Sequence, residues 1–184
     1  MVHDLGSMPV LGVSLANVSL LRLDQTGGPA PGNKSFKLRD YIAAAEHLAV
    51  PRLVSFGGAW SNHLHALAAV GAEQQFATVG IIRGDEAAVD TAMLADARAW
   101  GMQLVRVSRA EYRQRHDADY LAQLQRRFGP CLVIPEGGAN AEGARGCAAI
   151  AAMIKREAPS LRRILLPVGT GTTLAGLVAT LDAN

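Results

Sequence analysis

The chain has 184 residues, of which 49% are hydrophobic and 18% charged, and its formal net charge is +2. This composition is typical of a folded globular protein and excludes a disordered or fibrous one. Basic residues form no block and aromatic residues make up only 5%, so we expect no nucleic-acid partner. No apolar run approaches the roughly 20 residues that span a bilayer, and residues 1–7 do not begin a signal peptide. We therefore expect a cytoplasmic protein with no membrane partner.

Two cysteines, Cys131 and Cys147, are present without any CxxC spacing. They are too few for a disulfide framework, and nothing in their spacing predicts a metal site. We expect both to be small buried apolar side chains.

Short apolar runs alternate with longer alanine-rich segments along the chain, and clusters of Gly, Pro or Ser separate them. Strands are predicted at 18–23, 52–56, 76–82, 103–107, 131–134 and 163–168. Helices are predicted at 38–48, 61–70, 92–100, 117–128, 143–157 and 174–181, with apolar residues spaced three and four apart in the first of them. Strands that are each followed by a helix form βαβ units. The fold class is therefore α/β with a largely parallel sheet.

Three loops carry residues suited to chemistry, and in open α/β sheets such loops bind ligands at the carboxyl ends of the strands. The first contains Lys34, in the first turn of a predicted helix, and Lys37 one turn later. A cation there opposes the helix dipole. Either both lysines are solvated surface residues, or an amine of lowered pKa serves as a nucleophile. An anionic ligand would offset both charges.

The second loop runs from Ser55 to His63 and contains Gly57-Gly58, where the backbone can approach a ligand closely. Ser61 and Asn62 are good N-cap residues, so one interpretation is that they only begin the helix. Trp60 could stack on a planar ring or pack as an ordinary core residue. The loop carries more polar and aromatic groups than one helix cap needs.

The third loop is Gly169-Thr170-Gly171-Thr172-Thr173. Exposed amides and hydroxyls at a helix N-terminus form an anion site, so this loop predicts a phosphate. Leu174 stands where a dinucleotide-binding fingerprint has its third glycine, and no Gly-Lys-Ser/Thr follows. A reactive amine, a polar and aromatic wall and a phosphate cradle together suit pyridoxal 5'-phosphate (PLP).

Four motifs carry a resemblance to a known family. In chain order they are Gly32-Asn33-Lys34-x-x-Lys37-Leu38, Gly57-Gly58-x-x-Ser61-Asn62-His63, Pro135-Glu136-Gly137-Gly138 and Thr170-Gly171-Thr172-Thr173-x-Ala175-Gly176. Through them the sequence resembles the 1-aminocyclopropane-1-carboxylate deaminase / D-cysteine desulfhydrase family, which belongs to the tryptophan-synthase-β-like PLP enzymes of fold type II. The motifs lie in the family's order and cover nearly the whole chain.

The resemblance implies a role for each matching residue. Lys34 would bind PLP covalently and act as the base at the substrate carbon, with Lys37 near the phosphate. Asn62 would hydrogen-bond the ring hydroxyl of PLP, and the amides and hydroxyls of the loop 169–173 would hold its phosphate. Ser61 would contact the substrate carboxylate or assist proton transfer. The residues expected at the substrate are Trp60, Ser61, Asn62 and His63.

The resemblance also implies open parallel sheets with flanking helices in two domains. A larger PLP-binding domain would comprise 1–52 and 129–184, and a smaller domain, 53–128, would close over the substrate. Family members continue well beyond Asn184, so we expect a C-terminally truncated larger domain. The missing part would supply the partner of the pyridine nitrogen and a tyrosine used in ring opening. Family members are typically homodimers.

Two departures from the family pattern leave the substrate open. Phe36 stands where the family usually has arginine, and Ala59-Trp60 replaces Ile-Gln before Ser61. Because Trp60 would sit beside the substrate, the resemblance does not choose between a cyclopropane substrate and D-cysteine.

The function implied is that of a PLP-dependent deaminase or desulfhydrase, a lyase or hydrolase that releases ammonia and a 2-oxo acid from a small amino acid. One alternative is a non-catalytic fragment or pseudoenzyme that binds PLP or a phosphate ligand. A third hypothesis, an NAD-dependent oxidoreductase using the loop 169–173, is disfavoured by the missing glycine.

Overall fold

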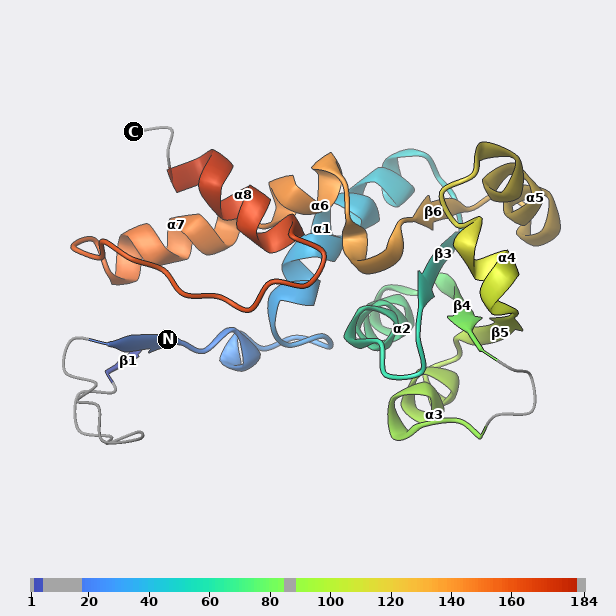
Figure 1. Ribbon diagram of the computed structural model, residues 1–184, viewed down its shortest axis with the longest axis horizontal. Coiled ribbons are helices and arrows are strands. Elements are labelled where there is room, and N and C mark those ends of the chain that lie inside the picture. The colour runs from blue at the N-terminus through green and yellow to red at the C-terminus, as the bar shows by residue number, and fades with distance from the viewer. Residues whose placement is uncertain (1, 5–17, 85–88, 182–184) are drawn as a thin grey trace.

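A four-stranded parallel sheet forms the centre of one part of the molecule in the computed structural model, which describes residues 2–4, 18–84 and 89–181 (Figure 1). The strand order is β5-β4-β3-β6. The strands are β3 (Arg52–Gly57), β4 (Ala77–Arg83), β5 (Gln103–Val107) and β6 (Leu132–Ile134). All neighbours pair in parallel, so their carboxyl ends meet at one edge. Both the α/β class and the parallel sheet are therefore confirmed.

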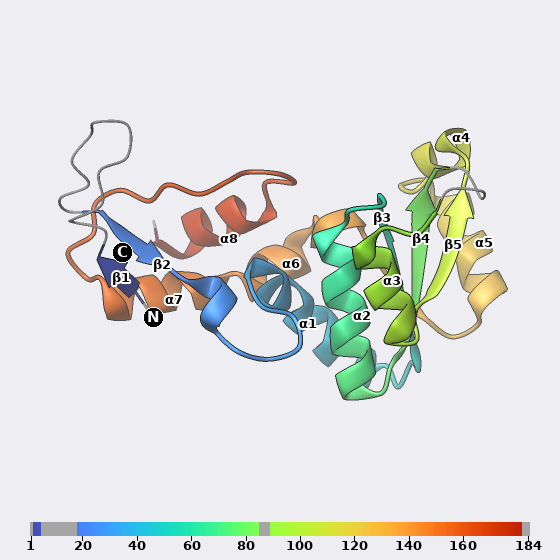
Figure 2. The same cartoon turned by 90° about the horizontal axis from the view of Figure 1, so that it is seen from below.

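Helices cover both faces of this sheet, as Figure 2 shows for α2 and α3 on one side and α4 and α5 on the other. Successive side chains of β3 alternate between the faces. Leu53 belongs to a buried cluster with α1 (Asn33–His47), α2 (Asn62–Gln74) and α3 (Ala92–Ala99). Val54 and Phe56 belong to a second cluster with α4 (Arg109–Arg113) and α5 (Ala118–Phe128). The sheet is thus buried on both faces, which explains its continuous apolar strands.

Side-chain caps begin four of these helices. The caps are Ser61, Thr91, Ser108 and Asp117, whose oxygens accept amide hydrogens from the first turns of α2, α3, α4 and α5. Each such cap stabilises a helix by about 1 kcal/mol. Helix α4 was not predicted, although Ser108 followed three residues later by Glu111 is a capping pattern that could have revealed it.

Three further helices lie away from the sheet: α6 (Ala141–Gly146), α7 (Ala148–Glu157) and α8 (Thr172–Leu181). Helices α6 and α8 contact α1, and α7 packs on α8 and α6. Glycines bring α6 close to its neighbours. A Cβ on Gly146 would lie 2.1 Å from the carbonyl oxygen of Phe36, and one on Gly143 would lie 2.0 Å from that of Gly138. The single helix expected at 143–157 is wrong, because the chain divides at Cys147 into α6 and α7.

Two predicted strands differ from the structure. The segment 18–23 contributes only β2 (Ser19–Leu21), which pairs antiparallel with β1 (Val2–Asp4) outside the parallel sheet, before the 3-10 turn η1 (Leu23–Gln25). The strand expected at 163–168 is absent, and Leu165 is 95% exposed. An apolar run becomes a strand only where a neighbouring strand supplies hydrogen bonds. None of the strands in the described part of the chain pairs with 163–168.

Other sequence expectations fare as follows. Cys131 and Cys147 are both buried and free, as predicted. No helix within the described residues is long and apolar enough to cross a membrane. Most of residues 1–7 lie outside the described part of the chain. The division into two domains stays a prediction.

Candidate functional site

The predicted phosphate loop and the two lysines of α1 line one cavity of about 380 Å³. In Figure 1 the N-terminal end of α8 lies beside that of α1, and Asn33 and Thr173, which stand at these two ends, are hydrogen-bonded. The lining residues are Asn33, Lys34, Lys37, Asn62, Gly137, Pro167, Val168, Gly169, Thr170, Gly171, Thr173 and Leu174. Segments about 135 residues apart in the sequence therefore form a single site.

Hydrogen bonds join the two lysines to the loop 169–173. The Asn33 amide nitrogen donates to Thr173 Oγ1 over 2.9 Å, and Lys34 Nζ donates to Asn33 Oδ1 over 3.0 Å. Lys37 Nζ makes a longer contact of 3.4 Å with Thr170 Oγ1. The Asn33 side chain thus connects the Lys34 amine to the loop.

Burial sets the electrostatics of the two amines. It lowers the pKa of Lys34 below its ordinary value, and the nearby Cys147 partly offsets that lowering. Burial lowers the pKa of Lys37 too, and the positive charge of Lys34 lowers it further. The sequence predicted this direction for Lys34, but the main cause is burial rather than the helix dipole. Lys37 is buried and Lys34 partly buried, and two such cations without a described counter-charge in the cavity would favour an anionic ligand.

The loop 169–173 has the backbone form of an anion cradle. Gly171 adopts a positive φ of 77°, and α8 begins at the next residue. Thr170 and Thr172 share a hydrogen bond of 2.8 Å between their hydroxyls. A Cβ on either Gly169 or Gly171 would meet nothing within 4 Å. The amides at the start of α8 are therefore free of intrahelical partners and lie beside open space.

The second loop contributes less to the cavity than the resemblance implied. Asn62 lines it, but Trp60, Ser61 and His63 do not. Trp60 is 68% exposed on the loop after β3, and His63 is buried beneath it. Ser61 caps α2 by accepting the amide hydrogen of Leu64 over 3.2 Å, which confirms the capping interpretation and leaves its own hydroxyl proton available.

Asn33 and Gly137, which line the cavity, and Ser55, which lies outside it, were given no role from the sequence. Asn33 makes the link just described. Gly137, which follows β6 in the 3-10 turn η2 (Glu136–Gly138), has a positive φ of 68°, and a Cβ there would lie 2.7 Å from Thr170 Cγ2. Ser55 lies fully buried in β3 and bonds to His63. The first two belong to quoted motifs, whereas the partners of Ser55 follow only from the folded structure.

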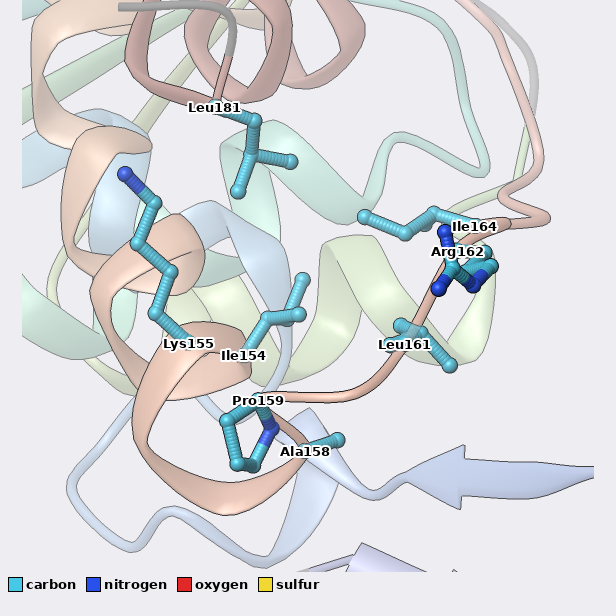
Figure 3. Close-up of a pocket in the computed structure, with 8 residues that line it drawn as sticks. All are labelled: Ile154, Lys155, Ala158, Pro159, Leu161, Arg162, Ile164 and Leu181. Atoms are coloured by element: carbon cyan, nitrogen blue, oxygen red, sulfur yellow. The ribbon is translucent and has the colours of Figure 1, made fainter. Parts of the chain in front are cut away.

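A larger cavity, of about 550 Å³, lies away from these residues (Figure 3). Figure 3 shows Ile154, Ile164 and Leu181 around a common space between α7, α8 and the coil that joins them. None of the residues predicted for chemistry lines it. Because Lys34, Lys37 and the predicted phosphate loop all line the smaller cavity, that cavity is the better candidate for the functional site.

The residues of the smaller cavity fit PLP. Lys34 offers an amine of lowered pKa for the aldehyde, Asn62 offers an amide for a ring substituent, and the loop 169–173 with Lys37 offers cationic and backbone donors for the phosphate. The volume lies within the range usual for small-ligand sites, about 300–1,000 Å³. The same constellation contains no third glycine that would seat a dinucleotide.

Comparisons with known proteins agree with this chemistry. The family model described as "Pyridoxal-phosphate dependent enzyme" matches residues 12–184. A Thermotoga maritima protein named "Putative 1-aminocyclopropane-1-carboxylate deaminase" is 31% identical over 167 residues, covering 89% of this chain and 53% of that protein. The hydrolase class expected beside lyase is wrong for this set of relatives.

Solved structures show the same fold. The crystal structure of an ACC deaminase homologue matches with a TM-score of 0.72 at 24% identity, covering 89% of this chain and 50% of that one. A hydrogen sulfide-producing enzyme from Fusobacterium nucleatum matches with a TM-score of 0.66 at 14% identity, covering 87% of this chain and 52% of its own. The chain thus spans about half the length of these relatives. With the fold of type II PLP enzymes and a family match over most of its length, this chain belongs to the pyridoxal-phosphate dependent enzyme family.

Proposed function

We propose that this chain supplies the PLP-binding site of a lyase or deaminase that acts on a small amino acid and releases ammonia and a 2-oxo acid. The observation that carries the proposal is the single cavity shared by Lys34, Lys37, Asn62 and the loop 169–173. The Thermotoga maritima relative named for 1-aminocyclopropane-1-carboxylate deaminase supports a small amino acid as substrate. Cyclic and D-cysteine-like substrates both fit this proposal.

When bound, PLP withdraws electrons from the substrate carbon. The chain's residues do the rest. Lys34 would hold the cofactor covalently, and its amine would serve as the base that takes the proton from the substrate carbon. Its lowered pKa keeps a larger share of the amine unprotonated at neutral pH, as a base requires. Asn62 orients the ring, and the amides and hydroxyls of Gly169–Thr173, with Lys37, fix the phosphate.

Ser61 is proposed to act on the substrate rather than on the cofactor. Its oxygen accepts the capping bond from Leu64 while its proton stays free to donate to a carboxylate. Trp60, exposed on the same loop, and His63 below it are proposed to shape the substrate side. A homodimer is proposed for the whole protein.

The chain's three lysines make the test unusually clean. They are Lys34, Lys37 and Lys155, and Lys155 lies on α7, bonded to the carbonyl of Thr180. Protein incubated with PLP is reduced with borohydride and mapped by mass spectrometry. We expect the label on Lys34 and a visible absorption band that Lys34→Ala abolishes while Lys155→Ala keeps. A colourless protein, or a label only on Lys37 or Lys155, would overturn the assignment.

A second candidate is a non-catalytic fragment or pseudoenzyme that binds PLP or a phosphate. It is supported by the two lysines and the Gly/Thr loop of the cavity, which offer donors to a phosphate whether or not a reaction follows. PLP-loaded protein is screened with small D-, L- and cyclic amino acids for a shift of the visible band and for release of ammonia and a 2-oxo acid. Binding of PLP without any shift or product would favour this second function.

A further inference from the structure

Ser55 is the fully buried centre of a hydrogen-bonded group beneath the site. Its Oγ lies 2.8 Å from the carbonyl oxygen of Ile134 on the neighbouring strand and 2.9 Å from Nε2 of His63. A hydroxyl has one proton, and a carbonyl oxygen can only accept. The Ser55 proton therefore goes to Ile134, so His63 must donate its Nε2 hydrogen to Ser55. The strands thereby fix the tautomer of the imidazole.

The other ring nitrogen of His63 has no such partner. His63 is 3% exposed, and its Nδ1 is buried without a hydrogen-bond partner among the described residues. Burial first, and then the positive charges of Lys34 and Lys37, lower the pKa of His63 to about 3. The imidazole consequently stays neutral beside the two lysines, and its single bonded contact is the one to Ser55.

This anchor lies next to Asn62 in the chain. Asn62 and His63 are the first two residues of α2, with Ser61 as the cap. Neighbouring residues on a helix point about 100° apart, and here Asn62 lines the cavity while His63 is turned into the protein. The inward anchor and the cavity-facing amide are thus carried by one helical turn.

We propose that Ser55 and His63 form a positioning pair that holds the first turn of α2 on strands β3 and β6 and so fixes Asn62 at the cavity wall. In this pair Nε2 of His63 donates the hydrogen bond to Ser55, and Nδ1 takes no part in positioning the helix. The effect of the pair on PLP binding rests on the proposed function. The hydrogen bond between Ser55 and His63 does not depend on that function.

Two substitutions of His63 test the roles of its two ring nitrogens separately. The amide of His63→Gln can reach the position of Nε2 and donate to Ser55, whereas the shorter His63→Asn can replace only Nδ1. We expect His63→Asn and Ser55→Ala each to weaken PLP binding about tenfold, the effect of one lost hydrogen bond. Both should shift the pH midpoint of the visible band in the same direction as Asn62→Ala. His63→Gln should stay within about twofold of the wild type.

Two controls test whether the effect is only one of stability. Val79 lies in β4, in the buried cluster on the sheet face opposite His63. Val79→Ala removes buried volume there, so it should lower the thermal midpoint of unfolding without changing the pH midpoint of the visible band. Ser55→Ala combined with His63→Asn should be no worse than the worse single change, because both break one bond. The proposal is overturned by a His63→Gln as impaired as His63→Asn, or by a Val79→Ala that shifts the band equally.

The hydrogen-bond arrangement is also testable without PLP. Nitrogen-15 shifts of His63 in the cofactor-free chain should show a neutral ring protonated on Nε2 in the wild type and lose that preference in Ser55→Ala. A ring protonated on Nδ1 would overturn the inference. A chain that shows the expected shifts but takes up no PLP would instead count against the proposed function and against the pair's role in binding it.

Discussion

Acidification should destabilise this chain through His63. In the folded chain burial, and then Lys34 and Lys37, hold the pKa of this histidine near 3, whereas an unfolded histidine has a pKa of about 6.5. Between these values the unfolded chain binds the extra proton, so the stability present above pH 6.5 is lost as the pH falls toward 3. At about pH 5, about 1.5 units below the unfolded value, the loss is about 2 kcal/mol.

Urea unfolding followed by circular dichroism at about pH 7 and about pH 5 measures this loss. The free energy of unfolding of wild type should fall more between the two pH values than that of His63→Gln, by about 2 kcal/mol. His47→Gln, an exposed position at the end of α1, is the matched control and should keep the wild-type dependence. If His63→Gln retained the full loss, the neutral buried histidine would not be its source.

Three other changes test the packing. Gly143→Ala should destabilise the chain by about 1–3 kcal/mol, because the new Cβ would lie 2.0 Å from the carbonyl oxygen of Gly138. Gly169→Ala is the control in the same urea titration, because a Cβ at Gly169 would meet open space. Asp117→Ala should lower the free energy of unfolding by about 1 kcal/mol through loss of the bonds to the amides of Asp119 and Tyr120, and no change would contradict its capping role. Leu165→Asp should change that free energy by less than about 0.5 kcal/mol, since this side chain is 95% exposed; a large loss would mean that Leu165 is packed.

The elements that the sequence predicted well are those whose signals are local. Strand β5 lies at Gln103–Val107 as expected, and Ser61 caps α2, because alternation, glycine punctuation and capping act within a few residues. The helix α4 was missed because five residues are too few to show an apolar period. Its one local signal was the spacing of Ser108 and Glu111.

The segment 163–168 failed for the opposite reason. Its apolar sequence is that of a strand buried on both faces, but a strand also requires a partner, and pairing is not a property of the segment itself. Within the described residues 163–168 pairs with none of the strands, and Leu165 and Val168 are exposed. Hydropathy therefore predicts that such a segment is suited to burial as a strand. It does not predict whether a neighbouring strand is available to pair with it.

The candidate site depends on contacts that the spacing of residues in the sequence does not predict. Each loop could be assessed by itself, so that a lysine in a first helical turn and a Gly/Thr loop before another helix were separate signals. What joins them is the Asn33 side chain, which accepts from Lys34 and donates to Thr173 across 140 residues. Spacing over so long a distance predicts no contact, and only the docking of α8 on α1 supplies it. Docking also buries both lysines and so lowers their pKa values, a shift that the isolated helix could not produce to the same extent. Lys34 thus owes its lowered pKa to the packing of α1, α6 and α8 as much as to its place in the sequence.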